Sequence, residues 1–568
     1  MLTTLAHSLP PGMLLIVGAI LVPALPGMLR GAWMLALPLV GLGQVLLLDN
    51  GTYLTFSAFD LQLAALHVDR LARLFGIIFH IAAIISVIYT LHERDPVQQV
   101  SGLIYAGAAI AAVFAGDLLT LFVFWEMTAI ASVFLILARR TPEATRAAMR
   151  YLLIQISSGV ILLAGVIVLA HEGRGIAFGT FDINDFAGAL ILVAFGIKAA
   201  FPLLHNWLQD AYPQATVGGT VFLSSFTTKL AIYALARGYA GTEQLIWIGT
   251  LMTAFPIFYA VIENDLRRVL AYSLNNQLGF MVCGIGIGTE MAINGAAAHA
   301  FSHILYKALL FMSMGAVLHR VGTVLGSELG GLYKSMPWTT GFCIVGAASI
   351  SAFPLFSGFI SKALIIEQAA EQGYVVVWLV LLFASAGVFH HSGIKIPYFA
   401  FFAHDSGKRC KEAPLNMLIA MAIAAAFCIG IGVFPGVLYD LLPYPVDFEP
   451  YTVGHVVGQL QLLLFSALAF AVLMRTGIYP PELRSTNLDF DWVYRRLLPR
   501  LAGAAYRGIA TASAAARDWA LGLTRALYDY IVSHHGPEGV LARTWPTGSM
   551  VMWAVVLLTA CLVFFYAR

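Results

Sequence analysis

The stretch GALILVAFGIKAAFPLLHNWLQDAYPQATVGGTVFLSSFTTKLAIY, residues 188–233, decides the fold, because it holds two apolar segments that each carry a lysine, Lys198 and Lys229. A charged side chain in the middle of a membrane span costs at least ~2.5 to 3.5 kcal/mol on insertion scales, so such a lysine indicates a functional site. Pro202 lies shortly after Lys198 and removes a backbone hydrogen bond beside the charge. We therefore expect two membrane helices, the first broken next to Lys198, in an ion path.

The composition of the whole chain is typical of a membrane protein. Of the 568 residues, 60% are hydrophobic and 11% are charged, whereas about 25% of the residues of a soluble protein are charged. The net charge of +2 gives no reason to expect binding to nucleic acid. The 5 cysteines lie far apart, without the spacing of a metal site. We therefore predict no disulfide, metal site, iron–sulfur cluster or other cofactor.

Apolar stretches of roughly 17 to 25 residues divide the chain into about sixteen expected membrane spans. No basic segment precedes the first of them, so we expect a retained span rather than a cleaved signal. The expected spans lie near residues 11–29, 32–48, 71–91, 100–115, 118–138, 149–170, 186–207, 214–236, 245–262, 268–287, 291–318, 339–368, 374–402, 415–436, 453–475 and 547–567.

The loops between these spans predict the orientation of the chain. Arginine and lysine gather in alternate loops, for example within residues 139–146, 267–268 and 408–411. The intervening loops, such as 181–185 and 439–450, are neutral or acidic. Because cytoplasmic loops hold the excess of basic residues, we expect a multi-pass protein of the bacterial inner membrane with its N-terminus outside.

The segment 488–535 differs from the rest of the chain because it is rich in arginine. It has six arginines from Arg495 to Arg525, and apolar residues recur at roughly helical spacing. This pattern predicts an amphipathic helix along the inner membrane surface, with a kink at Pro499. A solvated linker before the last span is the alternative.

One short string occurs twice. The sequence AFPL stands at residues 200–203 and again at 352–355, each time inside a long apolar segment near a lysine, Lys198 or Lys362. Corresponding proline-interrupted segments in two halves of a chain are typical of transporters built from inverted repeats. The duplication therefore favours a two-repeat membrane architecture.

Eight titratable residues lie on six of the expected spans. A single one could be structural, such as a neutral Glu126 bonded to a backbone carbonyl, or a lysine whose ammonium reaches the interface. Together they predict a polar, hydrated axis through the bundle, because unsatisfied polar groups in hydrocarbon are costly. The candidate residues for proton translocation are Glu126, Lys198, Lys229, His299, His303, Lys307, Lys362 and Lys395.

Two arrangements within this set suggest proton transfer. Burial favours a neutral lysine and a nearby carboxylate favours a charged one, so a Glu126–Lys198 ion pair would change its proton occupancy on opening. His299, His303 and Lys307 are spaced four residues apart and form a stripe of about 12 Å on one helix side. Histidine relays protons near neutral pH. The two histidines could also hold a metal, but the HExxH pattern is missing.

The strings that contain these residues resemble the antiporter-like subunits shared by respiratory complex I, membrane-bound hydrogenases and Mrp-type cation/proton antiporters. They occur in order over roughly residues 70–410: FWE at 124–126, GIKAAFPLLHNWLQDAYPQA at 196–215, TKLAIYAL at 228–235, ENDLRRVLAYSLNNQLGFM at 263–281, HAFSHILYKALLFMSMGAV at 299–317, LGGLYKSMP at 329–337 and FPLFSGFISK at 353–362.

The resemblance implies an all-α polytopic membrane protein with two inverted five-helix repeats that contain broken helices. It also implies that Glu126 is the fifth-helix glutamate, Lys198 the broken-helix lysine and Lys229 the connecting lysine. His299, His303 and Lys307 correspond to the central relay, and Lys362 to the outlet-side residue. TKLAIY and SGFISK are closer to the antiporter D-type subunit, and the chain after residue 480 resembles the lateral-helix region of the largest complex I antiporter-like subunit.

The chain departs from the family pattern at QATVGGT, residues 214–220, where a proline-rich turn is usual, and at Glu263, which stands at a place more often neutral. These departures concern loop geometry and cation access rather than the proton path. The expected domains are N-terminal helices at 1–99, an antiporter-like core at 100–410, further core helices at 411–480, an amphipathic lateral segment at 481–545 and a final span at 546–568.

We expect a subunit that moves protons, in exchange for Na⁺ or another monovalent cation, within a multi-subunit membrane complex in the lipid bilayer. The alternative is a proton-pumping membrane subunit of an NADH:quinone oxidoreductase or related redox complex. The sequence shows no motif for a redox centre, which favours a transporter subunit over an enzyme. A non-conducting scaffold is disfavoured because the whole set of titratable residues is present.

Overall fold

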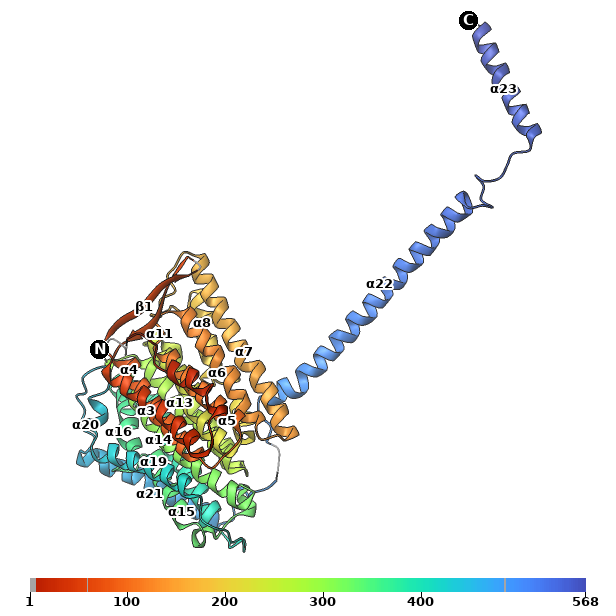
Figure 1. The fold of residues 1–568 in the computed structure, drawn as a ribbon. Helices are drawn as coiled ribbons and strands as arrows, with labels where there is room; N and C mark the ends of the chain where they lie inside the picture. Colours follow the sequence, from red (N-terminus) through yellow and green to blue (C-terminus); the bar gives the residue numbers. More distant parts are fainter. Residues whose placement is uncertain (1–6, 59, 485–486, 568) are drawn as a thin grey trace. The chain divides into compact units, whose positions relative to one another are not determined.

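The computed structural model describes residues 7–58, 60–484 and 487–567. The chain forms two compact units, Met1–Asn487 and Leu488–Arg568. In Figure 1 the first unit runs from red at the N-terminus to blue-green at α21, and the second contains α22 and α23.

The first unit is a bundle of helices, most of which begin or end at residues that the apolar pattern predicted. Up to the first break its elements are α2 (Met13–Ala19), η1 (Val22–Ala24), α3 (Gly27–Leu47), α4 (Arg70–Thr90), α5 (Pro96–Val113), α6 (Leu118–Leu137), α7 (Pro142–His171) and α8 (Phe186–Lys198). After it come α9 (Asn206–Ala211), α10 (Val217–Ser225), α11 (Thr227–Gly238), α12 (Glu243–Ile262), α13 (Leu266–Ile287), α14 (Glu290–Val321), α15 (Pro337–Ile350), α16 (Ser357–Glu371), α17 (Val375–Val388), α18 (Lys395–Pro397), α19 (Leu415–Val433), α20 (Gly436–Tyr439) and α21 (Val453–Arg475). Two π-helical segments, η5 (Phe389–Ile394) and η6 (Tyr398–Phe402), flank α18.

A β hairpin between α3 and α4 is an addition to the expected all-α membrane fold. Strands β1 (Gly51–Ala58) and β2 (Leu61–Val68) pair antiparallel. The hairpin is fixed to the helices by backbone bonds, such as that from the His67 amide to the Phe114 oxygen at 2.8 Å. Its strands alternate only weakly between buried and exposed residues, so they carry little of the period-2 signal by which a strand is predicted.

The two AFPL strings adopt the same backbone conformation, and each ends a helix. Ala200 and Leu203 have φ values of 61° and 70°, and Ala352 and Leu355 have values of 57° and 74°. Left-handed conformations cost non-glycine residues roughly 1–2 kcal/mol each, so the same four-residue strain occurs twice. The predicted break beside Lys198 is therefore present between α8 and α9, and a matching one separates α15 from α16.

The chain is a multi-pass membrane protein. In the described part of the chain, 12 helices are long and apolar enough to cross a membrane. The remaining expected spans, 11–29, 186–207, 268–287 and 339–368, also contain helices. Of these helices, α2, α8, α15 and α16 are short, and α13 is more polar. The full number of crossings, the inverted-repeat relation and the orientation stay predictions.

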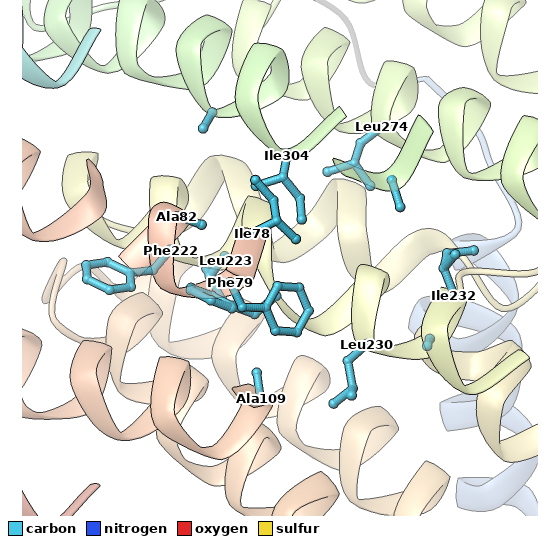
Figure 2. Packing of buried hydrophobic residues seen from close by; sticks show 14 of the residues in the cluster. Ile78, Phe79, Ala82, Ala109, Phe222, Leu223, Leu230, Ile232, Leu274 and Ile304 are labelled. Atoms are coloured by element: carbon cyan, nitrogen blue, oxygen red, sulfur yellow. The ribbon is translucent and has the colours of Figure 1, made fainter. Parts of the chain in front are cut away.

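Apolar side chains from several helices pack around the junction of α10 and α11. Figure 2 shows Phe79 of α4 close to Phe222 and Leu223 of α10, with Leu230 of α11 nearby. Aromatic rings add to this packing, because Phe79 meets Phe226 edge-on with ring centroids 5.2 Å apart. Lys229 follows this junction directly, so it lies inside a close-packed apolar core.

The second unit confirms a helix within the arginine-rich segment. Helix α22 (Leu498–His535) has 38 residues and none of them is buried. Pro499 lies in its first turn, directly after the π-helical segment η7 (Val493–Leu497), so the irregularity expected at this proline falls at the junction of the two segments. Helix α23 (Thr547–Tyr566) is apolar and long enough to span a membrane.

Candidate functional site

The predicted site residues are almost all buried in the first unit. Seven of the eight have at most 1% of their surface exposed, and Glu126 is half-buried. They lie on helices α6, α8, α11, α14, α16 and α18. The buried residues are Lys198, Lys229, His299, His303, Lys307, Lys362 and Lys395.

Glu126 occupies a cradle formed by a glycine. Its carboxylate lies against Gly159 of α7 so closely that a Cβ at that glycine would stand 1.5 Å from Oε1. Oε1 has no hydrogen-bond partner among the described residues. The same side chain lines an apolar pocket of about 730 Å³ between α5 and α6. The glycine and the pocket together leave the carboxylate room to change position.

Lys198 reaches α6 in the same turn as Glu126. Its Nζ donates to the Trp125 backbone oxygen at 2.6 Å and to the Thr128 hydroxyl at 2.9 Å. It also lies 4.4 Å from the centroid of the Trp125 ring. The closed Glu126–Lys198 ion pair that we expected does not form between these two described side chains, although their charges act on each other. The structure therefore holds the pair parted.

Lys229 lies just after the break between α10 and α11. Its Nζ donates to the backbone oxygen of Ser224 at 2.5 Å. That oxygen is free to accept because the helix is interrupted at Phe226, where φ and ψ are −106° and −66°. Tyr105 of α5 supports the break, because its hydroxyl accepts from the Thr227 amide at 3.0 Å. Sequence reasoning found this lysine but not the break.

His299 joins the α14 stripe to the second break. Its Nδ1 lies 3.1 Å from the Ser361 hydroxyl, and its Nε2 lies 3.3 Å from the Tyr306 hydroxyl. Ser361 directly precedes Lys362, whose charge acts on His299. The stripe on α14 thereby meets α16.

His303 occupies the centre of the group. The charges of Lys229, Lys307 and Lys362 all act on it, which places it between the first and second halves of the series. Neither of its ring nitrogens has a hydrogen-bond partner among the described residues. An imidazole with both nitrogens unpaired in a buried, charged surrounding is suited to passing a proton.

A hydrogen-bonded chain leads onward from Lys307. Lys307 Nζ donates to the Ser273 hydroxyl at 2.8 Å, and Ser392 donates to the same oxygen at 2.7 Å. Ser392 is in turn 2.8 Å from Nδ1 of His391. This path connects α14, α13 and η5. Ser273 and Ser392 were missed because a serine in a membrane helix carries no special signal.

Lys362 stands on α16 but bonds to the end of α15. Its Nζ donates to the backbone oxygen of Ile350 at 3.0 Å and lies 5.1 Å from the Phe280 ring centroid. Ile350 occupies the place in the second break that Lys198 occupies in the first, two residues before the alanine of AFPL. Lys362 thus brings its ammonium to the second break from the following helix.

Lys395 has the most complete set of partners. Its Nζ donates to the backbone oxygens of Ala260, Val261 and Glu263 at 3.2, 2.6 and 2.7 Å. It also forms an ion pair with Glu482 at 2.9 Å. These oxygens come from the C-terminal end of α12, where the helix dipole favours a cation. Sequence reasoning did not find Glu482.

The two departures from the family pattern have structural explanations. Arg267, buried at the start of α13, donates to the backbone oxygens of Tyr212 and Pro213 at 3.2 and 3.1 Å, and to the Thr220 hydroxyl. It thereby fixes the turn that contains QATVGGT. The Glu263 carboxylate accepts from the Asn264 amide at 3.0 Å and lies 3.7 Å from Arg268.

The candidate site residues do not form part of a metal-binding cluster in the part of the chain that the structure describes. No cluster of three or more histidine, cysteine, aspartate or glutamate side chains there could hold a metal ion. The cysteines are free thiols.

Comparison with known proteins shows a likeness to antiporter-like membrane subunits. The sequence profile of the family described as NADH:quinone oxidoreductase/Mrp antiporter, TM matches residues 115–389, which include all of the sites from Glu126 to Lys362. The Na(+)/H(+) antiporter subunit A1 of Staphylococcus aureus is 29% identical over 466 residues, covering 73% of this chain and 58% of its own length. Hydrogenase-4 component B of Escherichia coli K12 is 25% identical over 419 residues, covering 65% of this chain and 62% of its own.

The chain thus spans about three fifths of the length of these curated relatives. Two solved structures share its fold. The Mrp complex from Dietzia sp. DQ12-45-1b matches 100% of this chain and 63% of that chain with a TM-score of 0.72 at 23% identity. The membrane-bound sulfane sulfur reductase, an archaeal respiratory complex, matches 98% of this chain and 99% of that chain with a TM-score of 0.71 at 21% identity. A special likeness to a D-type subunit stays a prediction.

Proposed function

Because the chain belongs to the family of antiporter-like membrane subunits, we propose that it moves protons across the membrane along its buried titratable side chains. The path runs from Glu126 and Lys198 through Lys229 and the α14 stripe to Lys362 and Lys395. The observation that carries this proposal is the bonded chain from Lys307 through Ser273 and Ser392 to His391.

The buried lysines of this path are placed so that they can gain and lose protons. Lys229, Lys307 and Lys362 are fully buried, and their bonds are to neutral oxygens rather than to carboxylates. An isolated buried ammonium is costly, so such a lysine gives up its proton readily and regains it when a partner charge approaches. Neighbouring lysines also repel each other, so protonation of one disfavours protonation of the next.

The mechanism proceeds by closing and opening of ion pairs. When the Glu126 carboxylate approaches Lys198, it favours the charged ammonium. When the two part, as in this structure, Lys198 favours release of its proton toward Lys229. The disturbance then passes through His303 and Lys307, on which the charges of neighbouring lysines act, to Lys362.

The wider activity of the subunit is part of the same proposal. We propose that the protons are exchanged for Na⁺ or another monovalent cation and that the chain works with other membrane subunits. The name of the Staphylococcus aureus relative as a Na(+)/H(+) antiporter subunit supports both points. We further propose a bacterial inner-membrane location with the N-terminus outside, based on the distribution of basic loops.

Proton-coupled transport in everted membrane vesicles tests the proposal. Lys198→Ala and Glu126→Gln should each lower the rate about 100-fold or more, because each removes a proton-transfer group. The matched control is Lys334→Ala, since Lys334 is exposed and pairs with Asp405 at the surface. Transport that survives Lys198→Ala and Glu126→Gln at the control rate would contradict the proposed path.

A second candidate function is that of the proton-moving module of a redox complex. The 25% identity to a hydrogenase component favours it. In that case electron transfer belongs to other subunits, and purification of the native complex should yield proteins with iron–sulfur clusters. Purification with small membrane subunits alone supports gradient-driven exchange instead.

A further inference from the structure

The ion pair of Lys395 is built differently from the rest of the path. Lys395 and Glu482 are 2.9 Å apart, with 0% and 6% of their side chains exposed. Glu482 lies far along the chain from both AFPL breaks. It follows α21, in the segment 478–484, which we call the strap. Lys395 therefore has a carboxylate partner that a distant part of the chain supplies.

The strap is fixed on both sides of Glu482. Before it, the ring of Tyr479 packs against His390 and Phe470, with centroids 5.6 and 5.3 Å apart. After it, Arg484 forms an ion pair with Glu328. Pro480 and Pro481 restrict the backbone between these anchors. The position of the carboxylate is thus set by the fold rather than by a free loop.

The strap also borders a pocket of about 310 Å³. Its lining includes Gly326, Ser327, His404 and Glu482. The loops that contribute these residues lie at the end of the bundle that carries the basic loops, which is the end predicted to face the cytoplasm. Lys395 does not line this pocket. Glu482 therefore stands between the pocket and the buried lysine.

We propose that Glu482 is the charge partner of Lys395 and passes protons between this pocket and the buried path. The inference rests on the proposed function. It assigns Glu482 as the gate at one end of the proton path. A proton that moves from the Lys395 ammonium to the Glu482 carboxylate leaves a neutral amine and a neutral acid. The acid then releases this proton to water that enters the pocket, and the reverse steps load the lysine.

The backbone oxygens of Ala260, Val261 and Glu263 accept from the Lys395 ammonium and hold it beside the strap carboxylate. Neither Glu482 oxygen has a hydrogen bond among the described residues, so one N–H of the ammonium must turn from a backbone oxygen to the carboxylate before the proton passes. The first half of the path has its carboxylate, Glu126, parted from Lys198, whereas this pair is closed. The structure thus contains two carboxylate–lysine pairs in different states: Glu126 and Lys198 are apart, and Glu482 and Lys395 are in contact.

Transport as a function of pH in everted vesicles tests the gate, using the full chain in its native complex. Glu482→Gln should lower the rate at least about tenfold and change the pH profile, because it removes a proton carrier, whereas Glu482→Asp should restore part of the rate. Glu143→Gln is the matched control, since it makes the same carboxylate-to-amide change at an exposed position away from the strap. An equal loss in Glu143→Gln, or a Glu482→Gln rate within about twofold of wild type with the same profile, would overturn the proposal.

A transport-independent measurement checks the pair itself. Glu482→Gln should lower the Tm of the purified full chain, and adding Lys395→Gln should recover most of that loss, because no buried charge is then left unpaired. Additive losses would overturn the pairing. If Lys198→Ala transports normally while Glu482→Gln does not, the proposed path through Lys198 fails and the gate survives.

Discussion

At the scale of single residues, the site depends on where small side chains leave room. Gly159 is the clearest case, because the Glu126 carboxylate occupies the space of its missing Cβ. Glu126 carries the charge, but Gly159 decides where that charge lies relative to Lys198. The position of the carboxylate can thus be changed without changing its chemistry.

Gly159→Ala should displace the Glu126 carboxylate and reduce proton-coupled transport by roughly 10- to 100-fold, the effect of misplacing a reacting group by about 1 Å. The vesicle assay measures this. Gly165→Ala is a steric control on the same helix, because its Cβ would meet Ile191 rather than a charged group. A normal rate in Gly159→Ala would show that the carboxylate does not need this position.

Glu93, which lies outside the membrane spans, should make the free energy of unfolding depend on pH. Burial raises the pKa of Glu93, between α4 and α5, from 4.5 to about 7, although a backbone hydrogen bond from Gly218 opposes the shift. The folded protein therefore holds this proton between about pH 4.5 and 7, whereas the unfolded chain releases it. Stability should fall as pH rises through this window, by about 2 to 3 kcal/mol, and stay level above it.

Glu93→Gln should remove this fall, because an amide does not titrate. Thermal unfolding in detergent at pH 5 and pH 8 measures the difference. Glu143→Gln, at an exposed position that pairs with Arg146, should keep the wild-type slope. If Glu93→Gln also keeps that slope, Glu93 does not hold the proton.

The residues of the path differ in how well sequence reveals them. Lys198, Lys229 and Lys362 interrupt apolar runs, so their cost in a membrane makes them conspicuous. Ser273 looks like any small polar residue of a helix, and Glu482 lies far along the chain from Lys395, so only the fold brings each pair together. The expected Glu126–Lys198 pair is parted in this structure, because the sequence indicates which charges can meet but not which state of the pair is populated.

At the scale of elements, the breaks were more predictable than the hairpin. The proline of each AFPL string indicated a broken helix, and both breaks are present with matching positive φ values. The hairpin β1–β2 was missed because its strands alternate only weakly between buried and exposed residues. The break before Lys229 has no proline, since it depends on Phe226 and on Tyr105 from another helix.

The turn before α10 yields a prediction at this scale. Arg267 donates to several backbone oxygens of residues 212–216, so Arg267→Met would leave them without partners in a buried place. We expect a loss of about 3 kcal/mol or more in the free energy of unfolding, because hydrogen bonds to charged groups are the strong ones. Arg268→Met is the control, since Arg268 is partly exposed and faces Glu263 at 3.7 Å. Equal Tm values for the two variants would contradict the role of Arg267.

At the scale of the whole molecule, the second unit has no buried residues in either of its long helices. On α22, the apolar side chains of Tyr506, Ile509, Trp519 and Leu523 are each more than half exposed. Apolar surface of this extent is costly in water, so other protein surface or lipid must cover it. The resemblance to multi-subunit complexes favours partner subunits as the cover.

Truncation after Asn487 should therefore leave the first unit folded while removing its partners. The first unit has its own core, so its Tm should stay within a few degrees of the full chain, roughly the shift of a 1 kcal/mol change. Copurification of other membrane subunits should fall strongly. Trp519→Ala with Leu523→Ala should weaken it in the same direction, whereas Arg517→Ala on the charged face should not. A full chain that purifies alone and transports protons would instead assign α22 to the lipid surface.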